Sequence, residues 1–227
     1  MPSEPLLEVR DLTISLLPDR TLLHHVCFAI PPAAIVGLSG DSGSGKTTLA
    51  LAIPRLLPPS QYRVDGRILW RGRDLLAAGE RELEGVRGAQ IAMIFQDPLQ
   101  ALNPVLRAGE QVREVLRAHG AAGDPGKLLA QAGLPDVPRV LRAYPHELSG
   151  GERQRVTIAQ ALACGPSLII ADEPFTALDA PRVVELAALF RALRDELGTS
   201  FLLISHHAGV LRAVANRVLR VEDGHVV

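Results

Sequence analysis

"AAIVGLSGDSGSGKTTLA", residues 33–50, decides the fold of this 227-residue chain. Its first eight residues form an almost wholly apolar run that ends in glycine, the pattern of a buried strand in a parallel sheet. The residues that follow match GxxxxGK plus Ser or Thr, in which glycines let backbone N–H groups surround a phosphate. A chance match in a chain of this length is expected in about one case in a hundred. We therefore predict a strand, a phosphate-binding loop and a helix in succession.

The loop predicts a nucleoside triphosphate site. Lys46 is expected to reach the β- and γ-phosphates, and the hydroxyl of Thr47 is expected to bind Mg²⁺. The start of the helix behind the loop adds positive potential. The predicted cofactors are ATP and Mg²⁺, and the predicted ATP-binding residues are Gly40, Asp41, Ser42, Gly43, Ser44, Gly45, Lys46, Thr47 and Thr48.

A second stretch, "LIIADEP" at residues 168–174, carries two adjacent carboxylates. Four apolar residues predict a buried strand, and Asp172 follows at its carboxyl end, where ligands of open α/β sheets bind. We expect Asp172 to hold the Mg²⁺ shell and Glu173 to polarise a water against the γ-phosphate. Two carboxylates at a strand end can also be solubilising loop residues, but a phosphate loop in the same chain favours the catalytic interpretation.

The composition excludes several classes of protein. With 47% hydrophobic and 22% charged residues the chain can bury a core, and a formal charge of -1 predicts no nucleic-acid partner. Cys27 and Cys164 are the two cysteines and form no CxxC, so we expect neither a disulfide framework nor a zinc or iron–sulfur site. No signal peptide is recognisable, and no apolar run approaches the ~20 residues that span a bilayer. We expect a soluble chain that meets a membrane through partners.

Strand and helix patterns alternate along most of the chain. We predict strands within 6–15, 26–30, 66–76, 90–98, 167–174 and 199–207, with helices at 45–57 and 181–198. Such alternation implies a parallel sheet with right-handed crossovers. Between about 105 and 165, short helical patterns are separated by Gly and Pro, which indicates an inserted lobe. We expect one domain over 1–227, with a catalytic core and β subdomain at about 1–98 and 166–227 and a helical subdomain at about 99–165.

The stretch "ELSGGERQRVTIAQALAC", Glu147 to Cys164, poses a question. A serine and two glycines precede an amphipathic helix, which is again the chemistry of a phosphate-binding helix start. One ATP does not need two such sites. The plainer interpretation is a serine N-cap with a flexible lead-in.

The order of the motifs resembles that of ABC-type ATPases. The phosphate loop, "MIFQDP" with Gln96, "LSGGERQR", "LIIADEP", "ALD" ending at Asp179 and "ISH" ending at His206 follow one another as in that family. The resemblance runs from about residue 6 to the end of the chain. "MIFQDPLQALNPV" and "YPHELSGGERQRV" resemble the branch that serves oligopeptide, dipeptide and nickel importers. The implied fold is the ABC type of P-loop NTPase, with a mostly parallel core sheet, an antiparallel β edge and an inserted helical subdomain.

The resemblance also implies why two phosphate-binding stretches occur. In this family two ATPase domains face each other head to tail, so the signature residues Ser149, Gly150, Gly151 and Glu152 would act in trans on the partner's ATP. Gln96 would sense Mg²⁺ and the attacking water, Asp179 would lie at the dimer interface, and His206 would contact the γ-phosphate. The implied catalytic residues are Glu173, His206, Gln96 and Lys46, and the implied metal ligands are Thr47, Gln96 and Asp172.

The function implied is that of the ATP-hydrolysing subunit of an importer for peptides or nickel complexes. Its partners would be a second ATPase subunit, two transmembrane permease subunits and an extracytoplasmic substrate-binding protein, at the cytoplasmic face of the membrane. One alternative is a soluble ABC ATPase of the DNA-repair or translation type, which the single domain, the near-neutral charge and the lack of a coiled-coil insertion disfavour. Another is a regulatory subunit with little hydrolysis, against which Glu173 and His206 argue.

The sequence departs from the family pattern at one binding position. Leu16 stands where the family usually has an aromatic residue that stacks on adenine. Stacking on a base contributes about 1–3 kcal/mol in nucleic-acid complexes, so we hypothesise weaker or less base-selective ATP binding. Phe175 and His207 also differ from the usual residues but are not expected to touch the catalytic groups.

Overall fold

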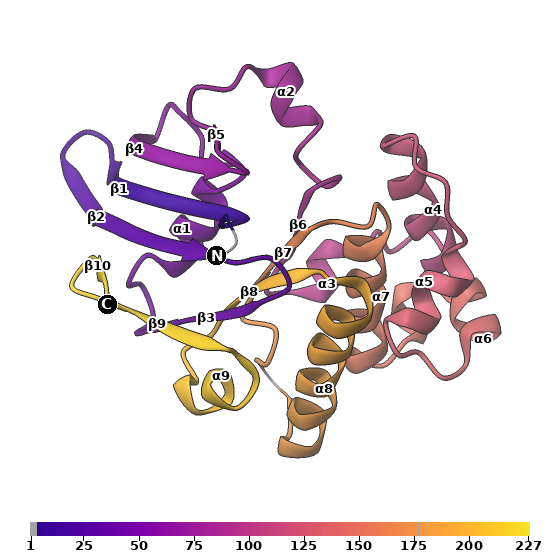
Figure 1. The fold of residues 1–227 in the computed structure, drawn as a ribbon. Helices are drawn as coiled ribbons and strands as arrows, with labels where there is room; N and C mark the ends of the chain where they lie inside the picture. The colour runs from indigo at the N-terminus through magenta and orange to yellow at the C-terminus, as the bar shows by residue number, and fades with distance from the viewer. Residues whose placement is uncertain (1–3, 177) are drawn as a thin grey trace.

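Two β-sheets and a lobe of short helices make up the computed structural model, which describes residues 4–176 and 178–227 (Figure 1). A four-stranded antiparallel sheet has the order β2-β1-β4-β5, and a six-stranded sheet has the order β10-β9-β3-β8-β7-β6. The strands are β1 (Leu7–Leu16), β2 (Arg20–Ile30), β3 (Ile35–Gly40), β4 (Tyr62–Trp70), β5 (Arg73–Asp74), β6 (Ile91–Ile94), β7 (Leu168–Asp172), β8 (Ser200–Ile204), β9 (Arg217–Glu222) and β10 (His225–Val226). The helices are α1 (Lys46–Ala52), α2 (Glu80–Glu84), α3 (Pro98–Ala101), α4 (Ala108–Ala118), α5 (Pro125–Gln131), α6 (Val137–Arg142), α7 (Gly150–Leu162), α8 (Ala180–Leu197) and α9 (Ala208–Val214), with a 3₁₀ turn at Pro145–Glu147.

The central strands β3, β7 and β8 are parallel and buried on both faces. Alternate residues of β7 and β8 enter two different cores: Ile169 and Phe201 pack with the helical side, whereas Ile170 and Leu202 pack with the antiparallel sheet and α1. Burial on both sides explains why these strands are apolar at nearly every position rather than at every second one.

The register of the parallel strands gathers the motifs at one edge. Leu38 of β3 lies opposite Ile204 of β8, and Ile204 lies opposite Asp172 of β7. The phosphate loop begins two residues after Leu38, and His206 follows two residues after Ile204. Segments more than a hundred residues apart in the sequence therefore end together at the carboxyl edge of the sheet, where open α/β folds bind ligands.

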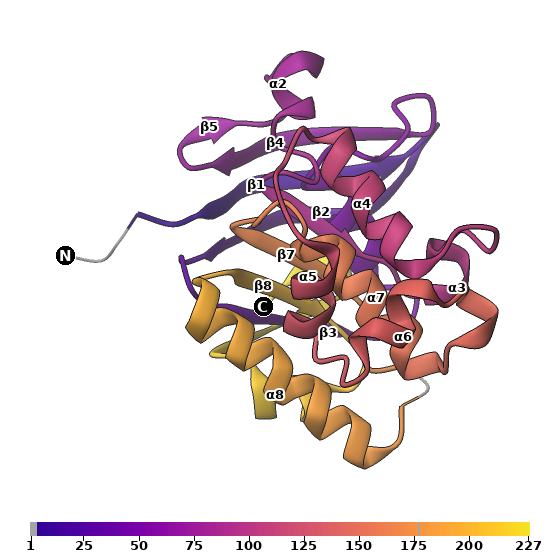
Figure 2. The ribbon, with the colours of Figure 1, turned by 90° about the vertical axis from the view of Figure 1, so that its right-hand side faces the viewer.

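The helices α3 to α7 form the lobe between β6 and β7, and α8 lies against the opposite face of the six-stranded sheet from the antiparallel sheet (Figures 1 and 2). The lobe shares one buried apolar cluster with the core, to which Val112 of α4, Leu129 of α5 and Ile158 of α7 contribute. The division into a core and a helical subdomain at about 99–165 stays a prediction. Among the described residues no helix is both long and apolar enough to cross a bilayer.

Three of the predicted elements differ from the observed ones. The strand predicted within 66–76 is in fact two antiparallel strands, β4 and β5, which are separated by a turn at Arg71 and Gly72. The helix predicted at 45–57 was too long, because α1 ends at Ala52 and Pro54 lacks the N–H that would continue the helical hydrogen bonding. The strand predicted at 26–30 was too short, because β2 begins at Arg20 and pairs with β1 along its whole length. The elements α2, α3, α9, β9 and β10 were not predicted.

Candidate functional site

The phosphate loop connects β3 to α1 in a backbone conformation that only glycine adopts without strain. Gly40 has φ 152°, and a Cβ atom placed there would lie 2.7 Å from the carbonyl oxygen of Val221. Gly45, the residue before α1, has φ 99°. The loop therefore turns tightly against β9 and presents its backbone toward the carboxyl edge of the sheet.

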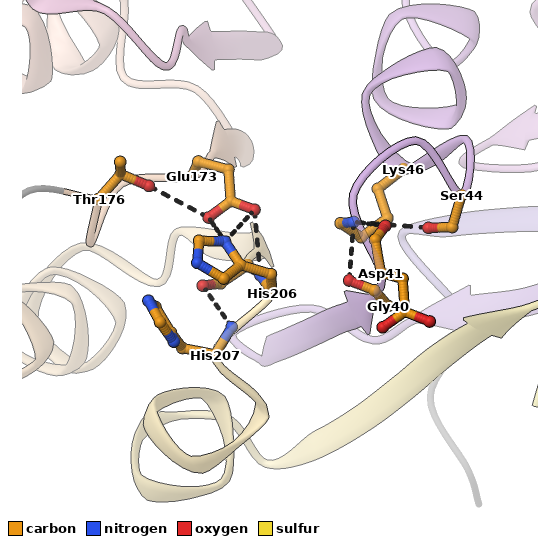
Figure 3. Close-up of polar contacts among 9 residues, drawn as sticks. Gly40, Asp41, Ser44, Lys46, Glu173, Thr176, His206 and His207 are labelled. Carbon is orange, nitrogen blue, oxygen red and sulfur yellow. Dashed lines mark hydrogen bonds and ion pairs between the residues drawn. The ribbon is translucent and has the colours of Figure 1, made fainter.

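Lys46 is held over this loop by the loop's own oxygens. Its side chain is buried, and Nζ donates hydrogen bonds to the carbonyl oxygens of Gly40 at 2.9 Å and Asp41 at 2.7 Å, with the hydroxyl of Ser44 at 3.4 Å (Figure 3). The ammonium group is thus positioned before a phosphate arrives. Phosphate oxygens would add charged acceptors beside these carbonyl acceptors.

Asp172 is buried at the end of β7, at 4% exposure, and contacts the hydroxyl of Thr47. Burial raises the pKa of the Asp172 carboxyl, as does the nearby charge of Glu173, whereas the hydrogen bond from Thr47 and the charge of Lys46 act in the opposite direction. Within the described residues its Oδ1 atom is buried without a hydrogen-bond partner. A buried carboxylate oxygen without a partner is costly, and a cation would remove that cost.

The oxygens near Asp172 suit a magnesium ion. Thr47, Gln96 and Asp172 line the same cavity, although Thr47 belongs to α1, Gln96 follows β6 and Asp172 ends β7. Carboxylate, hydroxyl and amide oxygens are the hard ligands that Mg²⁺ prefers, usually together with water and phosphate oxygens. The three residues predicted as metal ligands therefore line one cavity, and their oxygen atoms are of the kind that fits the ion.

Glu173 is fixed by contacts from three directions. Its backbone has φ 49°, an uncommon value for a residue with a side chain, and its N–H donates to the carbonyl of Ile204 at 3.0 Å. Its carboxylate accepts hydrogen bonds from the backbone N–H of His206 at 3.0 Å and from the hydroxyl of Thr176 at 3.3 Å, and Nδ1 of the His206 ring lies 3.0 Å from both oxygens (Figure 3). The turn thus aims the carboxylate at the histidine instead of into bulk solvent.

Thr176 and Gln154 make further contacts with the turn at Glu173. Neither residue was predicted from the sequence to be part of the site. Thr176 touches the Glu173 carboxylate, and the amide of Gln154 donates a hydrogen bond to the carbonyl of Pro174. Gln154 belongs to α7, so this helix is hydrogen-bonded directly to the turn that carries Glu173. Thr176 lies three residues after Glu173, and this spacing is the local sequence signal that could have predicted its contact with the carboxylate.

The signature helix α7 is capped by its own first residues. The hydroxyl of Ser149 accepts a hydrogen bond from the N–H of Glu152 at 3.3 Å, and the Glu152 carboxylate accepts one from the N–H of Ser149 at 2.8 Å. This reciprocal capping box defines the helix start, and Arg139 of α6 pairs with the same carboxylate. The interpretation as an N-cap is therefore confirmed for Ser149, and it leaves the N–H groups of the two glycines at the open end of the helix.

Glu152→Ala is expected to lower the free energy of unfolding by about 1 kcal/mol at neutral pH, because the capping box is lost. Burial acts to raise the pKa of Glu152, but its hydrogen bonds with Ser149 and the charge of Arg139 outweigh burial and lower it. A lowered folded-state pKa stabilises the protein above the ordinary value of 4.5, and this stabilisation is lost as the pH falls through the folded-state pKa. Urea unfolding at neutral and acidic pH should show a difference from wild type that shrinks in acid.

The matched control is Glu84→Ala, an exposed change on α2. A Glu152→Ala protein as stable as this control at neutral pH would contradict the capping interpretation.

The two phosphate-binding stretches face different cavities of the same chain. Ser149 and Gly151 line one cavity with the start of α8, and Gly151 lines a second with Gln96 and Glu173. Thr47 of the phosphate loop lines a separate cavity along β6. Asp179, predicted at a dimer interface, caps α8 by accepting a hydrogen bond from the N–H of Arg182 at 3.0 Å, and its side chain is 62% exposed.

A phosphate loop between a buried parallel strand and a helix, with a buried aspartate at the end of β7 and a positioned glutamate directly after it, defines a P-loop ATPase. The family model described as ABC transporter matches residues 23–176, so the chain belongs to the ABC transporter family. The dimeric post-hydrolysis structure of the ATP-binding cassette MJ0796 with ADP and Pi has a TM-score of 0.82 and 28% identity, covering 97% of this chain and 96% of that one. The predicted fold class and family are confirmed.

Several transport ATP-binding proteins are similar in sequence to this chain over nearly its whole length. The peptidoglycan transport ATP-binding protein YejF of Agrobacterium fabrum is 43% identical over 99% of this chain, which spans 43% of that protein. The oligopeptide transport ATP-binding proteins OppD of Bacillus subtilis and Salmonella typhimurium are 40% and 39% identical over 98% and 100% of this chain, which spans 65% and 70% of them. The chain thus spans between about two fifths and about seven tenths of these relatives.

Proposed function

We propose that this chain is the ATP-hydrolysing subunit of a peptide importer. The observation that carries the proposal is the meeting of Lys46, Thr47, Asp172 and Glu173 at one sheet edge, while the signature helix opens toward other cavities. The names of the relatives, which are peptidoglycan and oligopeptide transport proteins, support the transported class. No relative among these is named for nickel, so nickel transport stays a prediction from the motif resemblance.

Each residue has a distinct task in the proposed reaction. Lys46 and the loop N–H groups bind the β- and γ-phosphates, while Thr47, Gln96 and Asp172 hold Mg²⁺. Mg²⁺ held by these residues would neutralise charge on the phosphate oxygens. Glu173 accepts the proton of a water aligned with the γ-phosphate. The backbone N–H and the imidazole ring of His206 both contact the Glu173 carboxylate. ATP binding would turn the ring toward the γ-phosphate.

The signature of a second ATPase subunit would complete each site. The open N–H groups at Gly150 and Gly151 and the hydroxyl of Ser149 are suited to a phosphate, yet the cavities that these residues line include no residue of their own chain's phosphate loop. A head-to-tail pair would place them against the partner's γ-phosphate. The dimeric MJ0796 cassette supports such a pair.

The partner permease would dock in the large cavity between β6 and the helical lobe. That cavity is lined by Phe95, Gln96, Gln100 and Val115, and the Phe95 side chain is half exposed. A permease segment there would touch the residue proposed to sense Mg²⁺. The chain would then lie at the cytoplasmic face of the membrane, beneath two permease subunits supplied by an extracytoplasmic binding protein.

The test is purification of the tagged chain from native membranes, followed by reconstitution of whatever co-purifies into vesicles. We expect two permease subunits and ATP-dependent peptide uptake that Ser149→Arg abolishes. Recovery in the soluble fraction together with ribosomes or DNA would contradict the proposal and favour the uncoupled ABC ATPase. A complex that imports nickel instead would keep the ATPase role and overturn the peptide substrate.

Leu16→Tyr is expected to tighten ATP binding. Leu16 is half-buried at the end of β1, opposite Tyr62 of β4, and lacks an aromatic face for adenine. A gain of about 1 kcal/mol, the low end of base stacking, corresponds to about fivefold in Kd. Titration with ATP and with GTP measures the gain and its base selectivity, with Leu17→Tyr as the neighbouring control. Equal affinity in wild type and Leu16→Tyr would refute a stacking deficit.

A further inference from the structure

A cavity of about 560 Å³ opens beside the phosphate loop, between β3, β9 and α9. Its lining includes Asp41 of the loop and His206, and it extends to Arg212 of α9 and to Arg217 and Arg220 of β9. Sites for small ligands commonly measure roughly 300–1,000 Å³. The cavity is therefore large enough for an anion with its water, and one wall of it is the phosphate loop itself.

The charges that line this cavity are mainly positive. Arg220 lies 3.5 Å from the carboxylate of Glu222, whereas no described residue forms an ion pair with Arg212 or Arg217. Asp41 is the one acidic residue among the described residues of the lining. A guanidinium group without a carboxylate keeps its paired N–H donors for a ligand, and phosphate oxygens match that geometry.

Two of the three arginines, Arg217 and Arg220, lie on β9, and the third, Arg212, lies on α9. In the sheet register Arg220 lies opposite Ser39, next to the phosphate loop, and Arg217 lies opposite Val36 at the other end of β3. All three arginines are exposed to solvent. Positive charge thus continues from the loop to the surface, a distribution that draws an anion along it.

We infer that this cavity binds inorganic phosphate and is the route by which phosphate formed from ATP leaves the site. The inference rests on the proposed ATPase function, since hydrolysis would release the phosphate at the loop that forms one wall of the cavity. Phosphate passes His206 and Asp41, then exchanges its contacts with the loop for contacts with Arg220, and reaches solvent past Arg212. ADP remains bound at the loop.

The first experiment measures phosphate binding while the loop is occupied. Glu173→Gln loaded with ATP and Mg²⁺ keeps the triphosphate in place, so any bound inorganic phosphate lies elsewhere. Equilibrium dialysis with radiolabelled phosphate is expected to show binding that weakens about tenfold when Arg212, Arg217 and Arg220 are all replaced by Ala. Equal phosphate binding by the triple variant would overturn the site.

The second experiment separates product phosphate from free phosphate. In a single turnover with Glu173 intact, chemical quench gives the cleavage rate and a fluorescent phosphate sensor gives the release rate. The ratio of release to cleavage is expected to fall about tenfold in the triple variant, in line with the lost affinity. An unchanged ratio would overturn the exit route, even if phosphate binds.

Control variants distinguish a failure of the phosphate-exit inference from misfolding and from a failure of the proposed ATPase function. Arg73→Ala/Arg81→Ala removes two exposed arginines of β5 and α2 and should change neither binding nor the ratio. Arg212→Glu, a single change on the exposed face of α9, should weaken phosphate binding even if the triple variant fails to fold. A wild-type protein that cannot hydrolyse ATP refutes the proposed function, whereas hydrolysis with an unaltered ratio refutes this inference alone.

Discussion

Glu173→Gln is expected to lower the rate of ATP hydrolysis by about 10²–10⁴-fold, the contribution of a positioned general base. Glutamine preserves the shape of the side chain and can still accept hydrogen bonds from the N–H of His206 and the hydroxyl of Thr176. It cannot take the proton of the attacking water. ATP should therefore bind and stay intact, and light scattering over a protein concentration series should show an ATP-dependent dimer.

Two further variants make this result specific. Ser149→Arg in the Glu173→Gln background should abolish the dimer while each chain still binds ATP, because the bulky cation blocks the signature of the facing subunit. Thr176→Val, which removes one contact to Glu173 but no proton acceptor, should reduce the rate far less than Glu173→Gln. Hydrolysis by Glu173→Gln at the wild-type rate would rule out Glu173 as the base.

Asp172→Asn is expected to reduce hydrolysis by about 10²–10³-fold and also to raise the melting temperature of the metal-free protein. The loss of rate reflects several kcal/mol of charge stabilisation that the metal supplies at the phosphates. The gain in stability reflects the removal of a buried negative charge, whose cost is visible in the raised pKa of this carboxyl and in its unpartnered Oδ1 atom. Mg²⁺-dependent ATPase assays and thermal unfolding without metal measure the two effects.

The opposite signs of these effects distinguish a metal ligand from a structural aspartate. Asp179→Asn is the matched control, because Asp179 is exposed and its oxygen caps α8, so this change should alter the melting temperature little. An Asp172→Asn protein that unfolds at a lower temperature than wild type, with its Mg²⁺ dependence intact, would show that Asp172 serves the fold and not the ion.

Local patterns in the sequence predicted the parts of the site that lie within one motif. The apolar runs that became β3, β7 and β8, the phosphate loop at 40–48 and the serine N-cap of α7 were predicted because their signals span only a few neighbouring residues. Backbone hydrogen bonding, glycine dihedrals and side-chain periodicity act over such short distances. Proline chemistry also acts locally, and Pro54 is a local signal for the end of α1 at Ala52.

Contacts between motifs came only from the tertiary structure. The hydrogen bond between Thr47 and Asp172 joins α1 to the end of β7, and the contacts between Glu173 and His206 join the segments that follow β7 and β8. The sequence implied these contacts only through resemblance to a family. No pattern in the sequence predicted the arginine-lined cavity, since α9 and β9 were not predicted and their arginines look like ordinary surface charges.

The sequence by itself thus determined the class of fold and the chemical identity of each half-site in this protein. The tertiary structure decided which groups touch, and it did so through the register of β3, β7 and β8. That register depends on how helices and loops between the strands pack, over more than a hundred residues of chain. Packing of this kind sums many weak, non-local contacts, so no short stretch of sequence encodes it.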